Sequence, residues 1–201
     1  MILAAREFGC VVSGVDYSAD PIRASQAVTE AEDLCDRVDF VRGDAEALPF
    51  ADRCFDVALC ECSLCTFPDR ERALAELHRV LRRGGRVAIT DVIADRERLP
   101  GSLRGALAEI ACVGAAPSAR GYQRLIERAG FKLLAAEERG ADAAALAQRV
   151  EDRLRGARLL GWADSPAFPG GVEEAIELTR VARQAIAEGS LRYAIFAASR
   201  R

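Results

Sequence analysis

The sequence predicts an α/β fold in which helices cover a doubly wound, mostly parallel sheet. The first observation is a set of short apolar runs bounded by turn residues, such as residues 38–41 before Gly43-Asp44 and residues 55–59 before Glu61. Runs of this kind are typical of parallel strands that are buried on both faces. The second observation is that segments with apolar residues at helical spacing alternate with these runs, which is the element order of a parallel sheet with crossover helices.

The N-terminal half of the chain alternates between helices and strands. Residues 1–8 have the pattern of a helix end, stopped by Gly9, and residues 10–15 form an apolar strand that ends at Asp16. Pro21 opens a second helix, because the first helical turn does not need its missing N–H, and we expect this helix to reach residue 34. After the strands at 38–41 and 55–59, Asp69 caps a helix over residues 70–82 with one apolar face.

The C-terminal half adds the remaining strands and an insertion. Gly84-Gly85 end the preceding helix, and a strand over residues 86–90 has Asp91 at its end. Helices are predicted over 103–112 and 119–129, a strand over 131–136, and two helices within 141–188 that are separated at 162–171. The prediction is a single domain, with a core over residues 1–138, a helical insert over 141–188 and a closing strand over 191–200.

The composition is ordinary for a soluble globular protein. Of 201 residues, 50% are hydrophobic and 29% are charged. The net charge of −3 gives no electrostatic case for a nucleic-acid partner. No apolar run approaches the ~18 residues of a membrane span, so no membrane partner is expected. Seven cysteines at irregular spacing indicate reduced thiols in a cytoplasmic protein, and the first residues lack the pattern of a secretory signal.

Acidic residues follow the predicted strands at one edge of the sheet. Asp16 closes one strand, Asp44 follows the next, and Glu61-Cys62-Ser63 follow the third. Ligands of open parallel sheets bind outside the carboxyl ends of the strands, and an acid at such an end holds a ribose diol. The alternative is that Asp16 and Asp44 are turn acids that cap local structure, and that Glu61 is a solvated carboxylate.

These motifs resemble the class I S-adenosylmethionine (SAM) methyltransferases, which have a Rossmann-like fold. The resemblance covers roughly residues 1–138. It rests on the segment 43–57 and on residues 77–85, whose sequence is LHRVLRRGG. It implies that SAM is the cofactor and a small molecule the methyl acceptor. It further implies that Asp16 binds the ribose and that the adjacent Tyr17 also belongs to the cofactor site. Asp44 and Ala45 are then expected to contact the adenine, and Glu61, Cys62 and Ser63 to face the methionine end.

The chain departs from the family pattern at its start. In the family, a first strand and a glycine-rich GxGxG turn precede the first helix, and by family spacing both would lie before Met1. That strand would lie between the strand ending at Asp16 and the strand ending at Glu61, so we expect two open strand edges there. One explanation is a start placed too late in the sequence, and the other is a degenerate protein that no longer catalyses methyl transfer.

The cysteines suggest a soft methyl acceptor. Cys62 and Cys112 match positions that hold arsenite as thiolates in the arsenite methyltransferases, which the chain resembles more weakly. Thiolates suit soft metalloids, so these two cysteines are the candidate catalytic residues for an acceptor such as arsenite or a thiol. The opposing interpretation is that cysteines pack as small buried hydrophobes, which we expect for Cys10, Cys35 and Cys54.

Three other functions are weaker on the sequence alone. Cys62 and Cys65 have the spacing of half a zinc site, but no second pair follows, so no metal is predicted. A nicotinamide dehydrogenase of the same fold is disfavoured because a Tyr-x-x-x-Lys pair is absent and Lys132 is the only lysine. A thiol-rich, non-catalytic binding protein remains the alternative from a different class. His78, the only histidine, lies beside the apolar face of its helix and is a poor candidate for a general base.

Overall fold

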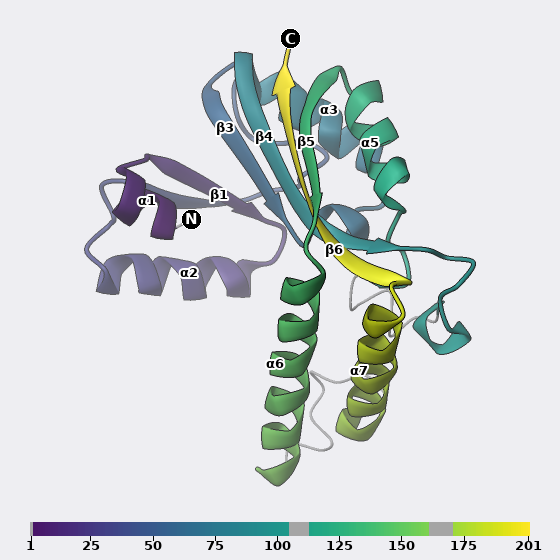
Figure 1. Ribbon diagram of the computed structural model, residues 1–201. Coiled ribbons are helices and arrows are strands. Elements are labelled where there is room, and N and C mark those ends of the chain that lie inside the picture. Colours follow the sequence, from purple (N-terminus) through teal and green to yellow (C-terminus); the bar gives the residue numbers. More distant parts are fainter. Residues whose placement is uncertain (1, 105–112, 161–170) are drawn as a thin grey trace.

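The strands form two separate sheets in the computed structural model, which describes residues 2–104, 113–160 and 171–201 (Figure 1). The smaller sheet pairs β1 (Val12–Asp16) with β2 (Val38–Arg42) in parallel. The larger sheet has the order β3-β4-β6-β5, and its strands are β3 (Phe55–Glu61), β4 (Leu81–Ala94), β5 (Phe131–Glu138) and β6 (Leu191–Arg200). β3, β4 and β5 share one direction, and β6 alone is reversed.

The predicted α/β fold and the predicted break in its sheet are both confirmed. Within the described part of the chain, β1 pairs only with β2, and β3 pairs only with β4. The sheet is therefore divided between the strand that ends at Asp16 and the strand that ends at Glu61. This is the place where the first strand of the family was expected.

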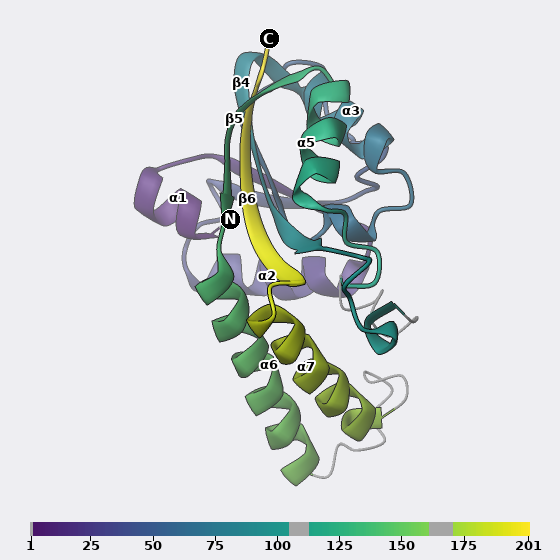
Figure 2. The same cartoon turned by 45° about the vertical axis from the view of Figure 1, so that its right-hand side comes forward.

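Helices cover one face of the larger sheet. α3 (Arg70–Val80) and α5 (Ala119–Arg128) lie on the same side of it (Figure 2). They enclose the main core, whose fully buried side chains include Leu74, Ile89, Tyr122, Ile126 and Phe196. Asp69 and Ser118 cap the two helices, because their side chains accept hydrogen bonds from the N–H groups of Arg72 and Gly121. α1 (Ile2–Phe8) and α2 (Ala19–Ala31) lie with the smaller sheet instead (Figure 1).

Two long helices project from one end of the larger sheet. α6 (Gly140–Leu159) follows β5, and α7 (Gly171–Ala187) leads into β6 (Figures 1 and 2). The buried carboxylate of Glu151 on α6 forms ion pairs with Arg155 and with Arg183 of α7, which joins the two helices. At the base of the pair, the short η2 helix (Gly101–Arg104) packs Leu103 into a second core with Leu191.

β4 begins earlier than the sequence predicted. α3 ends at Val80, and Leu81 already pairs with Phe55 of β3. Gly84 adopts φ +74°, a left-handed conformation that favours glycine, close to a register shift in the β3–β4 ladder. Gly84-Gly85 therefore produce an irregularity inside a strand, where the sequence had suggested the end of a helix.

Two predictions about burial were wrong. β3 was expected to be buried on both faces, but Val57 is 53% exposed and Leu59 is 63% exposed. The physical reason is that Val57 and Leu59 lie on the face of the sheet away from the main core, whereas Cys60 of the same strand lies on the core face and is buried. Cys10, Cys35 and Cys54, which were expected to be buried, are all exposed, because each lies outside a strand or helix interior.

Two further expectations concern residues outside the described part of the chain. The helix predicted over 103–112 is described only as far as Arg104, and the separation predicted at 162–171 is described only at Gly171. Cys112 therefore lies outside the described residues. None of the helices in the described part is long and apolar enough to cross a membrane.

Candidate functional site

The end of β1 presents an exposed carboxylate. Asp16 is the last residue of the strand, and its Oδ1 accepts a hydrogen bond of 2.8 Å from the backbone N–H of Ser18. Its second carboxylate oxygen has no hydrogen-bond partner among the residues that the structure describes. The next side chain, Tyr17, is 72% exposed. Asp16 thus caps the turn that follows β1, which was one of the two alternatives predicted for it. Its second carboxylate oxygen remains available to a ligand.

The turn after β2 lies directly against the end of β1. Gly43 donates its N–H to the carbonyl of Asp16 at 3.0 Å. A Cβ at Gly43 would lie 3.1 Å from the side chains of Val15 and Pro49, so a larger residue would push this turn away from β1. Asp44 follows, and its Oδ1 accepts the N–H of Glu46 at 2.8 Å. The structure therefore brings the segments of Asp16 and Asp44 together, as predicted.

Glu46 connects this turn to the segment that follows β3. Its Oε1 accepts the backbone N–H of Asp69 at 2.8 Å, and its carbonyl accepts Nε of Arg72 at 2.9 Å. Asp69 is the residue that caps α3. The turn that carries Asp44 is thus fixed to the larger sheet through α3, although the two sheets share no strand pairing in the described residues.

The chain turns sharply where β3 ends. Cys62 adopts φ +49°, which is uncommon for a residue other than glycine, and its N–H donates to the carbonyl of Thr90 at 2.8 Å. The hydroxyl of Ser63 donates to the carbonyl of Glu61 at 2.7 Å. The side chain of Glu61 is exposed. This geometry turns Cys62 out of the alternation of β3, so Cys60 and Cys62 differ in their surroundings.

Cys62 contacts a tyrosine from the last strand. Its Sγ lies 3.2 Å from the hydroxyl oxygen of Tyr193 on β6. Burial and this contact raise the pKa of Tyr193 well above its ordinary value, so the phenol stays protonated at neutral pH. Tyr193 can therefore donate or accept a hydrogen bond at this position, but it does not serve as a general base there.

The other two cysteines of this segment are buried. Burial, followed by the neighbouring Asp91, raises the pKa of the Cys60 thiol to about 12, so Cys60 is protonated near neutral pH. Cys65 is 1% exposed, and its N–H donates to Oδ2 of Asp91 at 2.9 Å. In the described part of the chain, no group of three His, Cys, Asp or Glu residues is arranged to hold a metal ion.

Asp91 supports the end of β3 from inside the protein. The sequence placed it at the rim of the sheet, but it is fully buried. Its two oxygens accept the N–H groups of Cys65 and Val92, and its charge together with burial raises the pKa of Tyr122. Arg70 completes this support by donating to the carbonyls of Leu64, Cys65 and Ala115.

Sequence reasoning missed two residues of this region. Tyr193 was not considered, and Asp91 was not given its supporting role. Tyr193 reaches Cys62 only because β6 runs antiparallel to β4, with Tyr193 opposite Val92. Cys112, the second predicted thiol, lies outside the described residues, so the pairing of Cys62 with Cys112 stays a prediction.

The comparisons with known proteins agree with this fold. Residues 1–89 match the sequence profile of a family described as a methyltransferase domain. The methyltransferase GfsG of Streptomyces halstedii is 35% identical over 133 residues, which are 65% of this chain and 48% of GfsG. An arsenite methyltransferase of Halobacterium salinarum is 33% identical over 138 residues, which are 65% of this chain and 34% of that enzyme. The chain thus spans half or less of the length of these two relatives.

Solved structures share the fold over almost the whole chain. The [4+2]-cyclase SpnF has a TM-score of 0.81 at 23% identity, over 99% of this chain and 69% of SpnF. A geranyl diphosphate methyltransferase in complex with SAM has a TM-score of 0.77 at 19% identity, over 100% of this chain and 73% of that enzyme. At these identities the likeness concerns the fold alone.

The fold is that of a Rossmann-like protein, and proteins of this fold bind their ligands at the carboxyl ends of the strands. The sequence matches make the chain similar to the class I SAM-dependent methyltransferases, as its motifs predicted, and the solved structures share its fold. The roles of the individual site residues stay predictions, and the activity and the acceptor of the whole protein are proposals.

Proposed function

We propose that the chain forms part of a SAM-dependent methyltransferase that acts on a small molecule. The observation that carries this proposal is the joining of Asp16 and Asp44 through the hydrogen bond from Gly43 N–H to the Asp16 carbonyl. Each of these carboxylates keeps one oxygen without a hydrogen-bond partner among the described residues. Two such acids fit a ligand with a ribose diol and an adenine amino group, which are hydrogen-bond donors.

The candidate residues would bind different parts of SAM. Asp16, with the exposed ring of Tyr17, would hold the ribose, and Asp44 with Ala45 would hold the adenine. Glu61, Cys62 and Ser63 would face the methionine end, because they follow the adjacent strand in the family pattern. When bound, SAM supplies a methyl group on a positively charged sulfur, and this sulfur takes the bonding electron pair when an acceptor attacks the methyl carbon. The chain then has to position the acceptor in line with that bond, and needs little acid–base chemistry of its own.

The Asp16→Ala variant tests this assignment. Loss of one charge-assisted hydrogen bond should weaken SAM binding by roughly 1.5–3 kcal/mol, which calorimetry measures directly. Asp36→Ala is the matched control, because Asp36 is an exposed acid that forms an ion pair with the neighbouring Arg37. Equal SAM affinity in the two variants would show that Asp16 does not hold the cofactor.

A soft acceptor such as arsenite or a thiol is the finer proposal. It is supported by the position of Cys62 at the end of β3 and by the arsenite methyltransferase among the relatives. Thiolates bind trivalent arsenic well, and the arsenic lone pair would attack the methyl carbon. Of the three cysteines in residues 60–65, only Cys62 is partly exposed.

Titration with As(III) tests the soft acceptor. We expect Cys62→Ser to lower the affinity for As(III) at least tenfold, since one thiolate ligand is lost. Cys35→Ser is the control, because Cys35 is exposed and lies between α2 and β2. If both variants bind As(III) like the unaltered chain, Cys62 does not hold this acceptor.

A further inference from the structure

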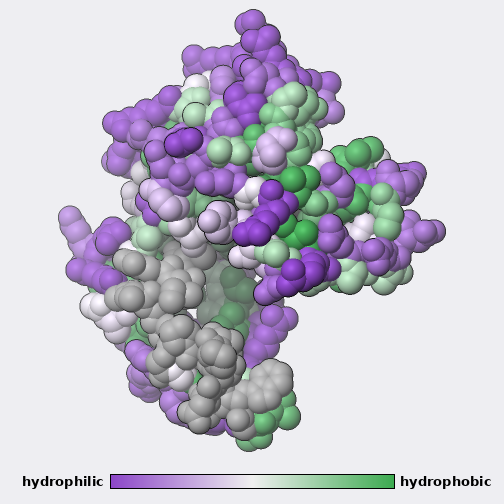
Figure 3. Space-filling view, turned by 180° about the vertical axis from the view of Figure 1, so that it is seen from behind, coloured by the Kyte–Doolittle hydropathy of each residue, from purple (hydrophilic) through white to green (hydrophobic). Residues whose placement is uncertain are grey.

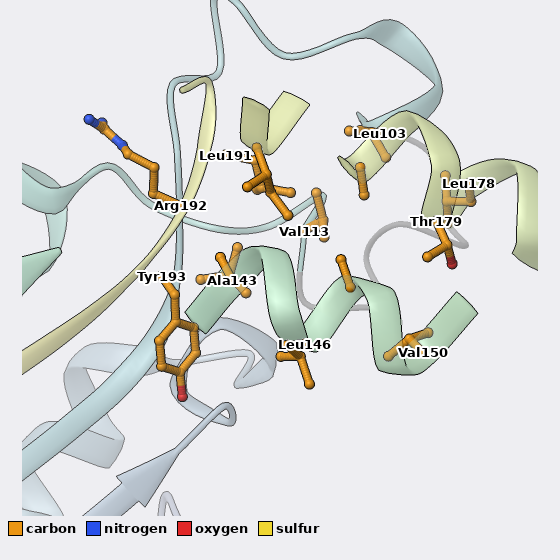
Figure 4. Close-up of a pocket in the computed structure, with 14 residues that line it drawn as sticks. Leu103, Val113, Ala143, Leu146, Val150, Leu178, Thr179, Leu191, Arg192 and Tyr193 are labelled. Carbon is orange, nitrogen blue, oxygen red and sulfur yellow. The ribbon is translucent and has the colours of Figure 1, made fainter. Parts of the chain in front are cut away.

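A cavity of about 160 Å³ lies where the α6–α7 pair meets the larger sheet (Figure 4). α6 contributes Leu146 and Val150, α7 contributes Leu178, and β6 contributes Leu191. Leu146 is 39% exposed and Val150 is 40% exposed, so the apolar lining continues to the surface at the mouth of the cavity. An open concave site with an aliphatic lining is typical of a binding site for a small apolar ligand.

The polar side chains around this cavity are engaged elsewhere. The Thr179 hydroxyl donates to the Ala175 carbonyl of its own helix at 2.8 Å. The guanidinium of Arg192 forms an ion pair of 3.1 Å with Glu138, and in Figure 4 this side chain extends away from the cavity. The only charged side chain among the described lining residues is thus already paired, and the rest of the lining offers an occupant mainly apolar contacts, which disfavours an ionic ligand.

Tyr193 connects the cavity with the end of β3. Tyr193 lines the cavity beside Ala143, and its ring extends away from the cavity (Figure 4). The hydroxyl of the same ring lies 3.2 Å from Sγ of Cys62. β3 ends at Glu61, which pairs with Thr90 of β4. β4 continues for four more residues beside β6, up to the pair Ala94–Leu191, and this extension forms the wall of the cavity next to the end of β3.

We propose that this cavity binds the hydrocarbon part of the methyl acceptor, and that the nucleophilic atom of the acceptor lies at the Tyr193 end. This inference rests on the proposed methyl transfer, and it names an apolar organic molecule as the acceptor, which is an alternative to arsenite. A cavity of about 150 Å³ with a Leu, Ile and Phe lining is large enough for benzene, so the bound part is a ring or branched chain of roughly six carbons. The acceptor's lone pair forms the new bond to carbon, the carbon–sulfur bond of SAM breaks, and a proton from a hydroxyl or amine acceptor passes to water.

Fluorobenzene is the probe for apolar binding, followed by fluorine NMR on the whole chain. Ala147→Phe places a ring into the cavity from α6 and should lower the affinity for fluorobenzene at least tenfold. Ala145→Phe makes the same change on the exposed side of α6 and should leave the affinity within twofold. Ala182→Phe fills the cavity from α7, so the result does not depend on the folding of one variant. Fluorobenzene that does not bind, or that binds all variants equally, would overturn the proposal.

The NMR signals of labelled tyrosines test whether the cavity binds the methyl acceptor. The chain has three tyrosines: Tyr17 follows Asp16, Tyr122 lies in the main core, and Tyr193 lies between the cavity and Cys62. Fluorobenzene should shift the Tyr193 signals, and millimolar SAM should shift both Tyr193 and Tyr17. If SAM shifts Tyr17 but not Tyr193, the acceptor assignment is wrong while the proposed function stands. If SAM shifts no signal of the chain, the proposed function itself is wrong.

Discussion

The strands β4, β3 and β1 differ in how fully their side chains are buried, although their sequences are similarly apolar. In β4 of the larger sheet, Val87 is 1% exposed and Ile89 is fully buried. In β3, Val57 is 53% exposed and Leu59 is 63% exposed. In β1 of the smaller sheet, the only buried residue is Gly14. Val87 and Ile89 face the main core together with Cys60 of β3, whereas Val57 and Leu59 lie on the opposite face of the same ladder. β1 and β3 also each have one paired edge in the described residues, while β4 has a strand on each side.

This difference teaches that an apolar sequence predicts a strand, while the elements packed on each face of the sheet decide which of its side chains are buried. Val57 and Leu59 form an exposed apolar surface on one face of β3, and the edge of β3 that is not paired with β4 is open in the described residues. The smaller sheet is held to the rest by the segment after β2. Arg79 of α3 donates to the carbonyls of Leu48 and Phe50, and Arg53 N–H donates to the Arg79 carbonyl.

The largest expected effect is a difference in hydrogen exchange between the two sheets. Amides of β6, which lies between β4 and β5, should open only with global unfolding, whereas amides of β1 should open locally. We expect protection in β6 to exceed protection in β1 by on the order of a hundredfold. Exchange followed by mass spectrometry resolves the two segments. Equal protection would mean that the smaller sheet is as firmly held as the larger one.

A smaller effect is expected from the contact that joins the two parts. Glu76 of α3 accepts the N–H of Leu48 at 2.8 Å and pairs with Arg79 at 2.8 Å. Glu76→Ala should lower the free energy of unfolding by about 1–3 kcal/mol, because the Leu48 N–H loses its acceptor and the Arg79 guanidinium loses one of its partners. Urea denaturation measures this change, and exchange in β1 and β2 should become faster than in β6.

The control for this variant comes from the same helix. Glu71 is 63% exposed and lies 3.4 Å from Arg128, so Glu71→Ala should change the free energy of unfolding by less than about 0.5 kcal/mol. The hydrogen bond from Arg79 lowers the pKa of Glu76, so the stabilisation is present above its ordinary pKa of 4.5 and is lost as the pH falls below that value. A stability that is equally sensitive to both substitutions would contradict the joining role of Glu76.

The sequence predicted the elements better than their surroundings. Periodicity identified every described strand, and the strand ends identified Asp16 and Asp44, because these signals are local. The burial of Val57 and Leu59 was predicted wrongly because it depends on what covers their face of the sheet, which an apolar run does not encode. Tyr193 was missed because it meets Cys62 across 131 residues of sequence, through an antiparallel register that no local pattern encodes.

SAM affinity is the most direct test of the claim that the binding site is divided by the open edge between β1 and β3. The measurement is calorimetry on residues 1–201 and on a chimera that carries, before Ile2, the segment of GfsG that precedes its matched part. A restored strand and glycine turn would pair both open edges and hold the amino-acid end of SAM. We expect residues 1–201 to bind SAM weakly and to self-associate in size-exclusion chromatography, and the chimera to be monomeric with at least tenfold higher affinity. A monomeric 201-residue chain that binds SAM as tightly as the chimera would contradict this account.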